Sequence, residues 1–425
     1  MKEEYLHHVF KKKMLGNTFN TINNKTLKVL DFGEHNTNAG PDFLDAKISY
    51  DGHVWAGPIE FHVNASDWYK HKHQHDPAYD NVVAHFVYKS DAAVQVKDFI
   101  IPTVEIAGQI DAKHYQKYKG LMQSTSNILC RDQIRQIDEE VINKQLNLSL
   151  KERLWRKALV VIKDIEANAG NRDKAFLLAV ARVFGGQVNQ LPFQTLVEKL
   201  EVKWLAKLNY DSLRTEALIF GISGLLNFQS EEDYVKQLQT DFLYQKKMFD
   251  IVEMPLQNWK YSRMRPHNFP DLRLAQFNGW LNSRPLTNDF LTANWDLENW
   301  RDGFKVELDP FWKNHFRLKG PANKLVTTKL TDGFIDLIFI NAVVPYIYAI
   351  GLWEGNDAYA QQAQKILKQI KPEKNTIISE WKKTGLNVAS AFETQSLLEL
   401  KKQGCNRKKC LFCALGKTIL SRTCS

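Results

Sequence analysis

The sequence predicts an α+β protein, in which a short helix and a mixed, mostly antiparallel sheet come first and helices follow. Residues 1–110 carry short runs of alternating apolar and polar residues, which are typical of half-buried strands. From about residue 112 apolar residues recur at helical spacing in long segments. We therefore expect an α/β domain at residues 1–135, a predominantly helical region at 136–400 and a Cys-rich tail at 401–425.

The first elements follow from local patterns. Residues 2–15 have Tyr5, Leu6, Val9 and Phe10 near helical spacing, which predicts an amphipathic helix. Asp51-Gly52 is a tight-turn signal between two alternating runs. The strands that we expect are residues 27–32, 43–50, 53–63, 82–88 and 99–106.

The second part of the chain has the longer period of helices. Periodic stretches predict helices within residues 138–184, 193–208, 213–226, 233–248 and 334–400. Residues 254–290 carry four prolines and are expected to be rich in loops: Pro255, Pro266, Pro270 and Pro285.

Two absences predict a location. No run approaches the ~20 apolar residues that span a bilayer, so no membrane partner is expected. The N-terminal segment lacks the continuous apolar stretch of a secretory signal. We therefore expect a cytoplasmic protein.

Charge and histidine are unevenly distributed. The net charge is +9, yet residues 1–100 hold eleven Lys and Arg against thirteen Asp and Glu. Nine of the twelve histidines lie in the same segment. An acidic, His-rich segment on a basic body suits a metal site that serves a polyanionic substrate, so nucleic acid is the expected partner. A basic chain is common, and charge alone does not decide this.

The chemistry is expected where two strands meet. Asp42 follows a Gly-Pro turn at the start of the strand 43–50, and Glu60 and His62 lie on the next strand. Alternate residues of a strand share a face, so Glu60 and His62 point the same way and Asp42 can converge on them. Two carboxylates beside a nitrogen suit Mg²⁺ or Mn²⁺ at a phosphate ester. Taken singly, Asp42 capping a turn and Glu60 facing solvent would be the commoner arrangements.

Further polar residues surround this stretch. Asn36, His73, Asp80 and His85 are candidates for orienting the substrate phosphate, and the histidines for binding a second metal or acting as general acid. His71 and His75 are expected to be solvated.

Four of the five cysteines lie at the end of the chain. Cys405, Cys410 and Cys413 have C-x4-C-x2-C spacing, which suits Zn²⁺ or an iron–sulfur cluster. Either Cys130 or Cys424 would supply the fourth ligand; a frayed tail with free thiols is the alternative.

A basic segment farther along mixes cations with aromatic rings. Arg263, Arg265, Arg273 and Trp259 are candidate nucleic-acid contacts. The equal alternative is a structural loop in which the arginines tie helix ends together.

These motifs resemble a bacterial family of unknown function, domain-of-unknown-function family 2851, found mainly in Bacteroidetes. The resemblance covers the whole chain but implies no settled activity. It rests on Glu4-Tyr5-Leu6-His7, Asn36-x-x-Ala39-Gly40-Pro41-Asp42-Phe43, Gly57-x-Ile59-Glu60-x-His62, Ser66-Asp67-Trp68, His71-x-His73, Ala78-Tyr79-Asp80-Asn81-Val82-Val83, His85 and Cys410-Leu411-x-Cys413-x-x-Gly416.

A more distant likeness is to the PD-(D/E)xK nucleases. It implies a restriction-endonuclease-like N-terminal domain with Glu4 on the first helix, and with Asp42 and Glu60 as metal ligands. His62 stands where these nucleases have the Lys that positions or activates water. Some of them close the catalytic domain with a metal cluster held by one early and three C-terminal cysteines.

The sequence therefore predicts a divalent-metal-dependent nuclease that uses Asp42, Glu60, His62 and Glu4. One alternative is a non-catalytic nucleic-acid-binding protein on a degenerate nuclease scaffold. The other is a different metal hydrolase, in which the histidines hold a transition metal.

Overall fold

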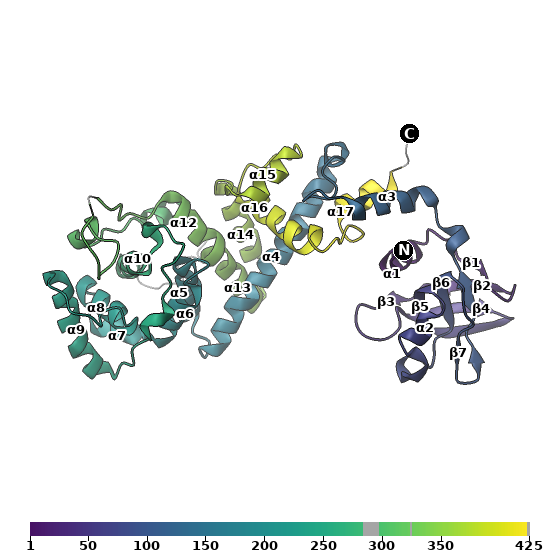
Figure 1. Ribbon diagram of the computed structural model, residues 1–425, viewed down its shortest axis with the longest axis horizontal. Helices are drawn as coiled ribbons and strands as arrows, with labels where there is room; N and C mark the ends of the chain where they lie inside the picture. The colour runs from purple at the N-terminus through teal and green to yellow at the C-terminus, as the bar shows by residue number, and fades with distance from the viewer. Residues whose placement is uncertain (284–296, 324, 423–425) are drawn as a thin grey trace. The chain divides into compact units, whose positions relative to one another are not determined.

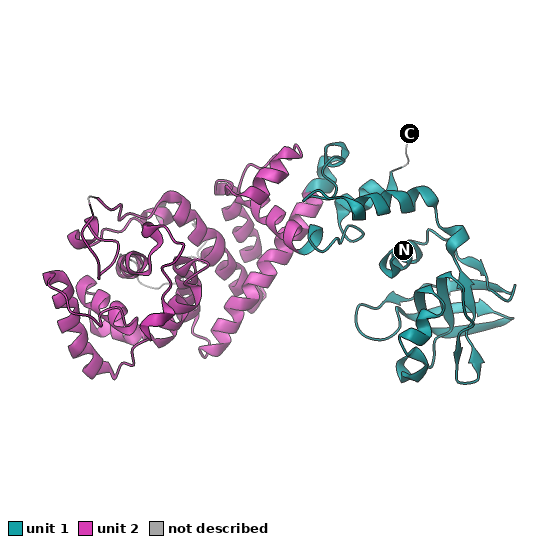
Figure 2. Ribbon diagram, in the orientation of Figure 1, with its two compact units in different colours: residues 1–142, 403–425 teal, residues 143–402 magenta. Residues whose placement is uncertain are grey.

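A computed structural model describes residues 1–283, 297–323 and 325–422, and of Ser283 and Asn299 only the backbone. The chain divides into two compact units, coloured separately in Figure 2. Unit 1 comprises Met1–Ile142 and Gln403–Ser425, and unit 2 comprises Asn143–Lys402. The C-terminal tail thus belongs to the same unit as the N-terminal sheet.

Unit 1 is built on a mixed sheet with the strand order β1-β2-β4-β5-β6-β9, to which β3 adds by pairing with β4. β7 and β8 form a separate pair (Figure 1). The strands are β1 (Thr18–Asn20), β2 (Thr26–Asp31), β3 (Glu34–His35), β4 (Phe43–Tyr50), β5 (His53–Asn64), β6 (Ala84–Lys89), β7 (Gln95–Val96), β8 (Phe99–Ile100) and β9 (Thr103–Glu105). The helices are α1 (Glu3–Lys11), α2 (Asp67–Lys70), α3 (Ala112–Gln123) and α17 (Ala414–Ser421).

The central hairpin forms as the sequence predicts. Asp51 and Gly52 both have positive φ, of 53° and 78°, which suits the two-residue turn between β4 and β5. The next connection differs, because β5 pairs with β6 in parallel, and β6 with β9 in parallel. Parallel strands need a crossover, and α2 with two short 3-10 turns, His73–His75 and Pro77–Tyr79, supplies it.

The sheet buries a different core on each face. Phe61 stacks on Phe86 with ring centroids 5.2 Å apart, and Phe10 of α1 packs 4.9 Å from Phe61. Because side chains alternate along β5, Glu60 and His62 point to the opposite face, where Trp68 of α2 is fully buried. The two hydrophobic cores thus hold α1 against one face of the sheet and the crossover against the other, where Glu60 and His62 also lie.

Unit 2 is helical, which confirms the predicted order of a mixed sheet followed by a mostly helical region. α10 occupies part of the predicted loop region, whose last residues, 284–290, lie outside the described part of the chain. The helices are α4 (Glu139–Ala167, which begins in unit 1), α5 (Arg172–Gly185), α6 (Gln190–Lys199), α7 (Val202–Lys207), α8 (Ser212–Ile222), α9 (Asp233–Phe249), α10 (Pro270–Ser283), α11 (Leu297–Asp302), α12 (Asp332–Ile338), α13 (Val344–Glu354), α14 (Asp357–Gln369), α15 (Thr376–Lys383) and α16 (Ala391–Glu399), with π-helical turns at Phe339–Val343 and Leu400–Cys405.

One helix corrects the expectation that no segment is apolar enough to span a bilayer. Asp332–Glu354 runs for 23 residues, and its most apolar window has a mean hydropathy of 1.8. In this structure 78% of that window is buried inside the protein. A buried core helix and a membrane span pass the same test of length and composition.

Candidate metal centre

Asp42 and Glu60 lie against each other at the junction of β4 and β5. The Asp42 backbone N–H donates to Glu60 Oε2 at 3.1 Å, and the Phe61 backbone N–H donates to Asp42 Oδ2 at 2.9 Å. These two reciprocal bonds hold each carboxyl beside the other strand. Burial, and then the Asp42 charge, raises the pKa of Glu60. A bound cation would relieve this crowding of two acids.

The turn before β4 explains why Asp42 is held there. The Asn36 amide donates to Ala39 O at 3.1 Å and to Pro41 O at 3.0 Å. The Asn36 backbone N–H also donates to Asp42 O at 2.8 Å. The structure thus places Asn36 in the turn that carries Asp42, with its amide nitrogen used internally.

Three histidines gather above Glu60. One ligand atom from each of His62, His71 and His73 lies within 4.8 Å of those of the other two. His62 Nε2 is 3.2 Å from His71 Nδ1 and 3.7 Å from Glu60 Oε1. His73 Nε2 is 3.6 Å from the same Glu60 oxygen. Ligands bound tetrahedrally at about 2.0–2.1 Å are about 3.3–3.4 Å apart. The separations of His62 from His71, and of Glu60 from His62 and His73, are therefore close to those around one transition-metal ion.

His85 supports this group from the neighbouring strand. It lies opposite Glu60 in the register of β5 and β6, and its Nε2 is 2.8 Å from His62 Nδ1. When His62 donates that proton to His85, its Nε2 lone pair is left for a metal. Burial, and then His85, His73 and His71, lowers the pKa of His62 to about 2. Burial, and then His73, lowers that of His85 to about 3. Both rings are therefore neutral at pH 7, as metal ligation requires.

The first helix approaches the site with a different acid from the one predicted. Glu4 is exposed, on the flank of α1 where its charge acts on Tyr118. Glu3 lies on the other flank, and burial, and then the Asp42 charge, raises its pKa. His7, one turn after Glu3, places its Nε2 3.1 Å from Asp42 Oδ2. The structure therefore does not bring Glu4 to Asp42, whereas it places Glu3 and His7, which the sequence analysis did not single out, on the flank of α1 that faces Asp42.

Two further residues lie where the sequence did not predict them. His71 is exposed as a residue, yet its ring belongs to the cluster, so it is not simply solvated. Asp80 lies apart from the cluster and accepts a hydrogen bond from Lys97 Nζ at 2.7 Å. His73 is in the cluster, where it stacks on Tyr79 with ring centroids 3.8 Å apart.

Comparison with known proteins places the chain in a family. The family model described as "Protein of unknown function (DUF2851)" matches residues 3–376. The chain belongs to this family. No curated protein and no solved structure matches the chain significantly. The DUF2851 match includes every residue of the carboxylate–histidine cluster and ends before the four cysteines of the tail.

The cysteines of this DUF2851 chain gather within unit 1. Burial, and then the Cys405, Cys413 and Cys410 thiols, raises the pKa of Cys130, so all four lie within electrostatic reach. Burial raises the pKa of Cys413, and the backbone N–H groups of Gly416 and Leu415 at the start of α17 oppose that rise. No three described cysteine sulfurs lie within 4.8 Å of one another. Cys424, the other candidate, lies outside the described residues.

The basic segment of this DUF2851 chain belongs to unit 2. Arg263 and Arg265 are exposed. Arg273 lies 3.7 Å from the Phe334 ring centroid and donates to Asn268 Oδ1 at 2.7 Å and to Gln276 Oε1 at 2.9 Å. Arg273 therefore ties its own neighbourhood together, which is the structural alternative that the sequence left open.

Proposed function

We propose that this protein is a divalent-metal-dependent nuclease, in which Glu60 and the three clustered histidines hold the metal. The observation that carries the proposal is the group of nitrogens from His62, His71 and His73, with one Glu60 oxygen beside those of His62 and His73. Three imidazoles favour a transition metal such as Mn²⁺ or Zn²⁺ over Mg²⁺, which prefers oxygen ligands. When bound, the metal supplies positive charge for a phosphate ester and lowers the pKa of a water.

The neighbouring groups suit the proton transfers of hydrolysis. The oxygen of a water forms a bond to phosphorus, the bond from phosphorus to the leaving oxygen breaks, and one water proton must be accepted. The His7–Asp42 pair, at 3.1 Å, provides an acceptor beside the metal ligands. The leaving oxygen takes up a proton from solvent. Nucleic acid as the substrate is supported by the net charge of +9 and by the likeness to nucleases described above.

The test is cleavage by protein stripped of metal and reloaded. Single- and double-stranded DNA and RNA oligonucleotides are incubated with Mn²⁺, Zn²⁺ or Mg²⁺. We expect cleavage with a transition metal, and a loss of about 100-fold or more in Glu60→Gln and His73→Ala. His75→Ala is the matched control, because His75 is exposed two residues away and is outside the cluster.

Two negative outcomes have different meanings. Oligonucleotide binding without cleavage under any metal would favour the non-catalytic scaffold. Stoichiometric Zn²⁺ or Mn²⁺ that is lost in His73→Ala, without any nucleic-acid binding or cleavage, would instead favour a metal hydrolase with another substrate.

We also propose that Cys130, Cys405, Cys410 and Cys413 bind an iron–sulfur cluster. The proposal is supported by their shared neighbourhood and by the nearby N–H groups of Gly416 and Leu415, which favour the thiolate form of Cys413. A single zinc ion, bound at about 2.3 Å, needs sulfurs about 3.8 Å apart. The wider spread of the described sulfurs suits a larger cluster.

Anaerobic purification followed by iron and acid-labile sulfide analysis tests this second proposal. We expect Cys130→Ser to lose the iron and Cys424→Ser to keep it. The reverse result would make Cys424 the fourth ligand, and stoichiometric zinc without sulfide would refute the cluster.

A further inference from the structure

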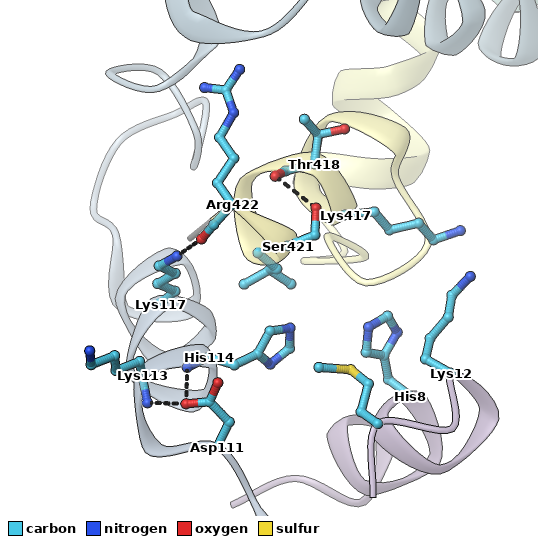
Figure 3. A pocket seen from close by; sticks show the side chains of 12 residues that line it. His8, Lys12, Asp111, Lys113, His114, Lys117, Lys417, Thr418, Ser421 and Arg422 are labelled. Carbon is cyan, nitrogen blue, oxygen red and sulfur yellow. Dashed lines mark hydrogen bonds between the residues drawn. The ribbon is translucent and has the colours of Figure 1, made fainter. Parts of the chain in front are cut away.

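A second polar site lies in unit 1, in a pocket of about 690 Å³ between α1, α3 and α17 (Figure 3). Its volume is that of a pocket for a ligand of about nucleotide size. His8 comes from α1, Lys12 from the position directly after α1, His114 from α3, and Lys417 from α17. α1 therefore carries the candidate metal site on the flank of Glu3 and His7, and this pocket on the flank of His8 and Lys12.

The pocket is strongly cationic. Five cationic residues line it: Lys12, Lys113, Lys117, Lys417 and Arg422. Among all the described residues that line the pocket, Asp111 is the sole acid. The Asp111 carboxylate caps α3, accepting the N–H groups of Lys113 at 2.7 Å and His114 at 3.2 Å. The negative charge of Asp111 is thus bound by the N-terminal N–H groups of α3.

The electrostatic field inside the pocket changes the pKa of the His8 imidazole. Burial, and then His114, Lys12 and Lys417, lowers the pKa of His8 to about 4. The His8 and His114 rings lie face to face with centroids 6.2 Å apart, and Lys12 and Lys417 lie on the His8 side (Figure 3). His114 is itself held by the Tyr5 hydroxyl, 2.7 Å from its Nδ1. Lys12 and Lys417 therefore place positive charge beside the two rings, and an anion would neutralise that charge.

The geometry points to this pocket as a phosphate-binding subsite for one nucleotide unit. The lysines and imidazole N–H groups would bind the phosphate oxygens, and the paired rings offer a surface for the base. The phosphate belongs either to a nucleic-acid strand or to a mononucleotide. The first source rests on the proposed nuclease function, whereas the recognition of phosphate does not.

The experiment measures binding by the full-length protein in EDTA, so that cleavage plays no part. The probe is a fluorescent single-stranded oligonucleotide, titrated at several salt concentrations, with AMP as competitor. We compare Lys12→Gln/Lys417→Gln with Lys28→Gln/Lys47→Gln, which removes the same charge from exposed strand positions of unit 1. Each lost phosphate contact lowers the salt slope by about 0.7 for a single strand, so the pocket variant should lose about 1.4.

The outcomes separate the two sources and the two proposals. A selective loss of oligonucleotide binding in the pocket variant, with competition by AMP, supports the strand. AMP binding alone, lost in the pocket variant, supports a mononucleotide pocket. Equal losses in both double variants, or no loss in either, overturn the inference. Because binding is measured without metal, an inactive Glu60→Gln variant that still binds would leave the pocket standing.

Discussion

Unit 1 and unit 2 both bury titratable side chains, but they surround them with different partners. In unit 2, Glu399 accepts from Arg156 at 2.6 Å and from Arg153 at 3.2 Å. Glu216 accepts from Trp312 Nε1 at 3.0 Å. In unit 1 the buried groups also lie against their own kind, Glu60 against Asp42 and His62 against His71 and His85.

The difference separates structural from functional burial. A buried charge with a complementary partner is already satisfied, so it ties elements together and needs no ligand. A buried set of like groups raises the free energy of the folded state, and a ligand that binds the set lowers it again. His85 Nδ1 adds to this, because it is buried with no hydrogen-bond partner among the described residues. On this comparison we expect the proposed metal to bind in unit 1.

The largest expected effect tests the structural pairing in unit 2. Glu399→Gln leaves Arg153 and Arg156 without their shared carboxylate, and should lower the free energy of unfolding by about 3–5 kcal/mol. Urea denaturation followed by tryptophan fluorescence measures it. Glu354→Gln, which removes a half-exposed partner of Arg172, should cost at most about 1 kcal/mol. Equal costs for the two variants would show that burial adds nothing to the pairing.

A second effect concerns the pH dependence of unit 2. Burial raises the pKa of Glu216 from 4.5 to about 7. Between these two pKa values the folded state keeps the proton that the unfolded state releases. The stabilising contribution of Glu216 to folding is therefore complete below pH 4.5 and is lost as the pH rises through 7. At about 1.36 kcal/mol per pKa unit the loss is about 3 kcal/mol. Denaturation between pH 4.5 and 8 should show it, and Glu216→Gln should remove that slope; an unchanged slope would contradict the assignment.

Metal should act on unit 1 alone. Mn²⁺ or Zn²⁺ at about 100 times its dissociation constant would add about 2.7 kcal/mol to the free energy of unfolding. Hydrogen exchange read by mass spectrometry resolves the two units, and protection should increase around β5 and β6. His73→Ala should abolish the increase, whereas His75→Ala should keep it. An equal increase in protection in unit 2 would show that the effect of metal is not confined to unit 1.

The sequence was sufficient for β2, β4, β5 and β6 and for the central pair of the site, but not for the short strands β1, β3 and β7 or for the division of residues 99–106 into β8 and β9. Period-two alternation and the Asp51-Gly52 turn located β4 and β5, and therefore the meeting of Asp42 with Glu60. It was insufficient for His71, which ends α2 and is oriented by the following turn, where Lys72 has φ of 62°. The parallel pairing of β5 with β6 was also missed, because its crossover contains short turns instead of one long periodic helix.

The smallest effect tests the helical position that the sequence misjudged. Successive residues of a helix are rotated by about 100°, so Glu3 and Glu4 face different flanks once Tyr5, Leu6, Val9 and Phe10 are buried. Glu3→Gln removes a negative charge near Asp42 and should weaken metal binding about tenfold, or about 1.4 kcal/mol. Glu4→Gln, beside it in the sequence, should change the dissociation constant little. Calorimetric titration with Mn²⁺ compares the two variants, and a larger effect at Glu4 would mean that α1 presents its other flank to the site.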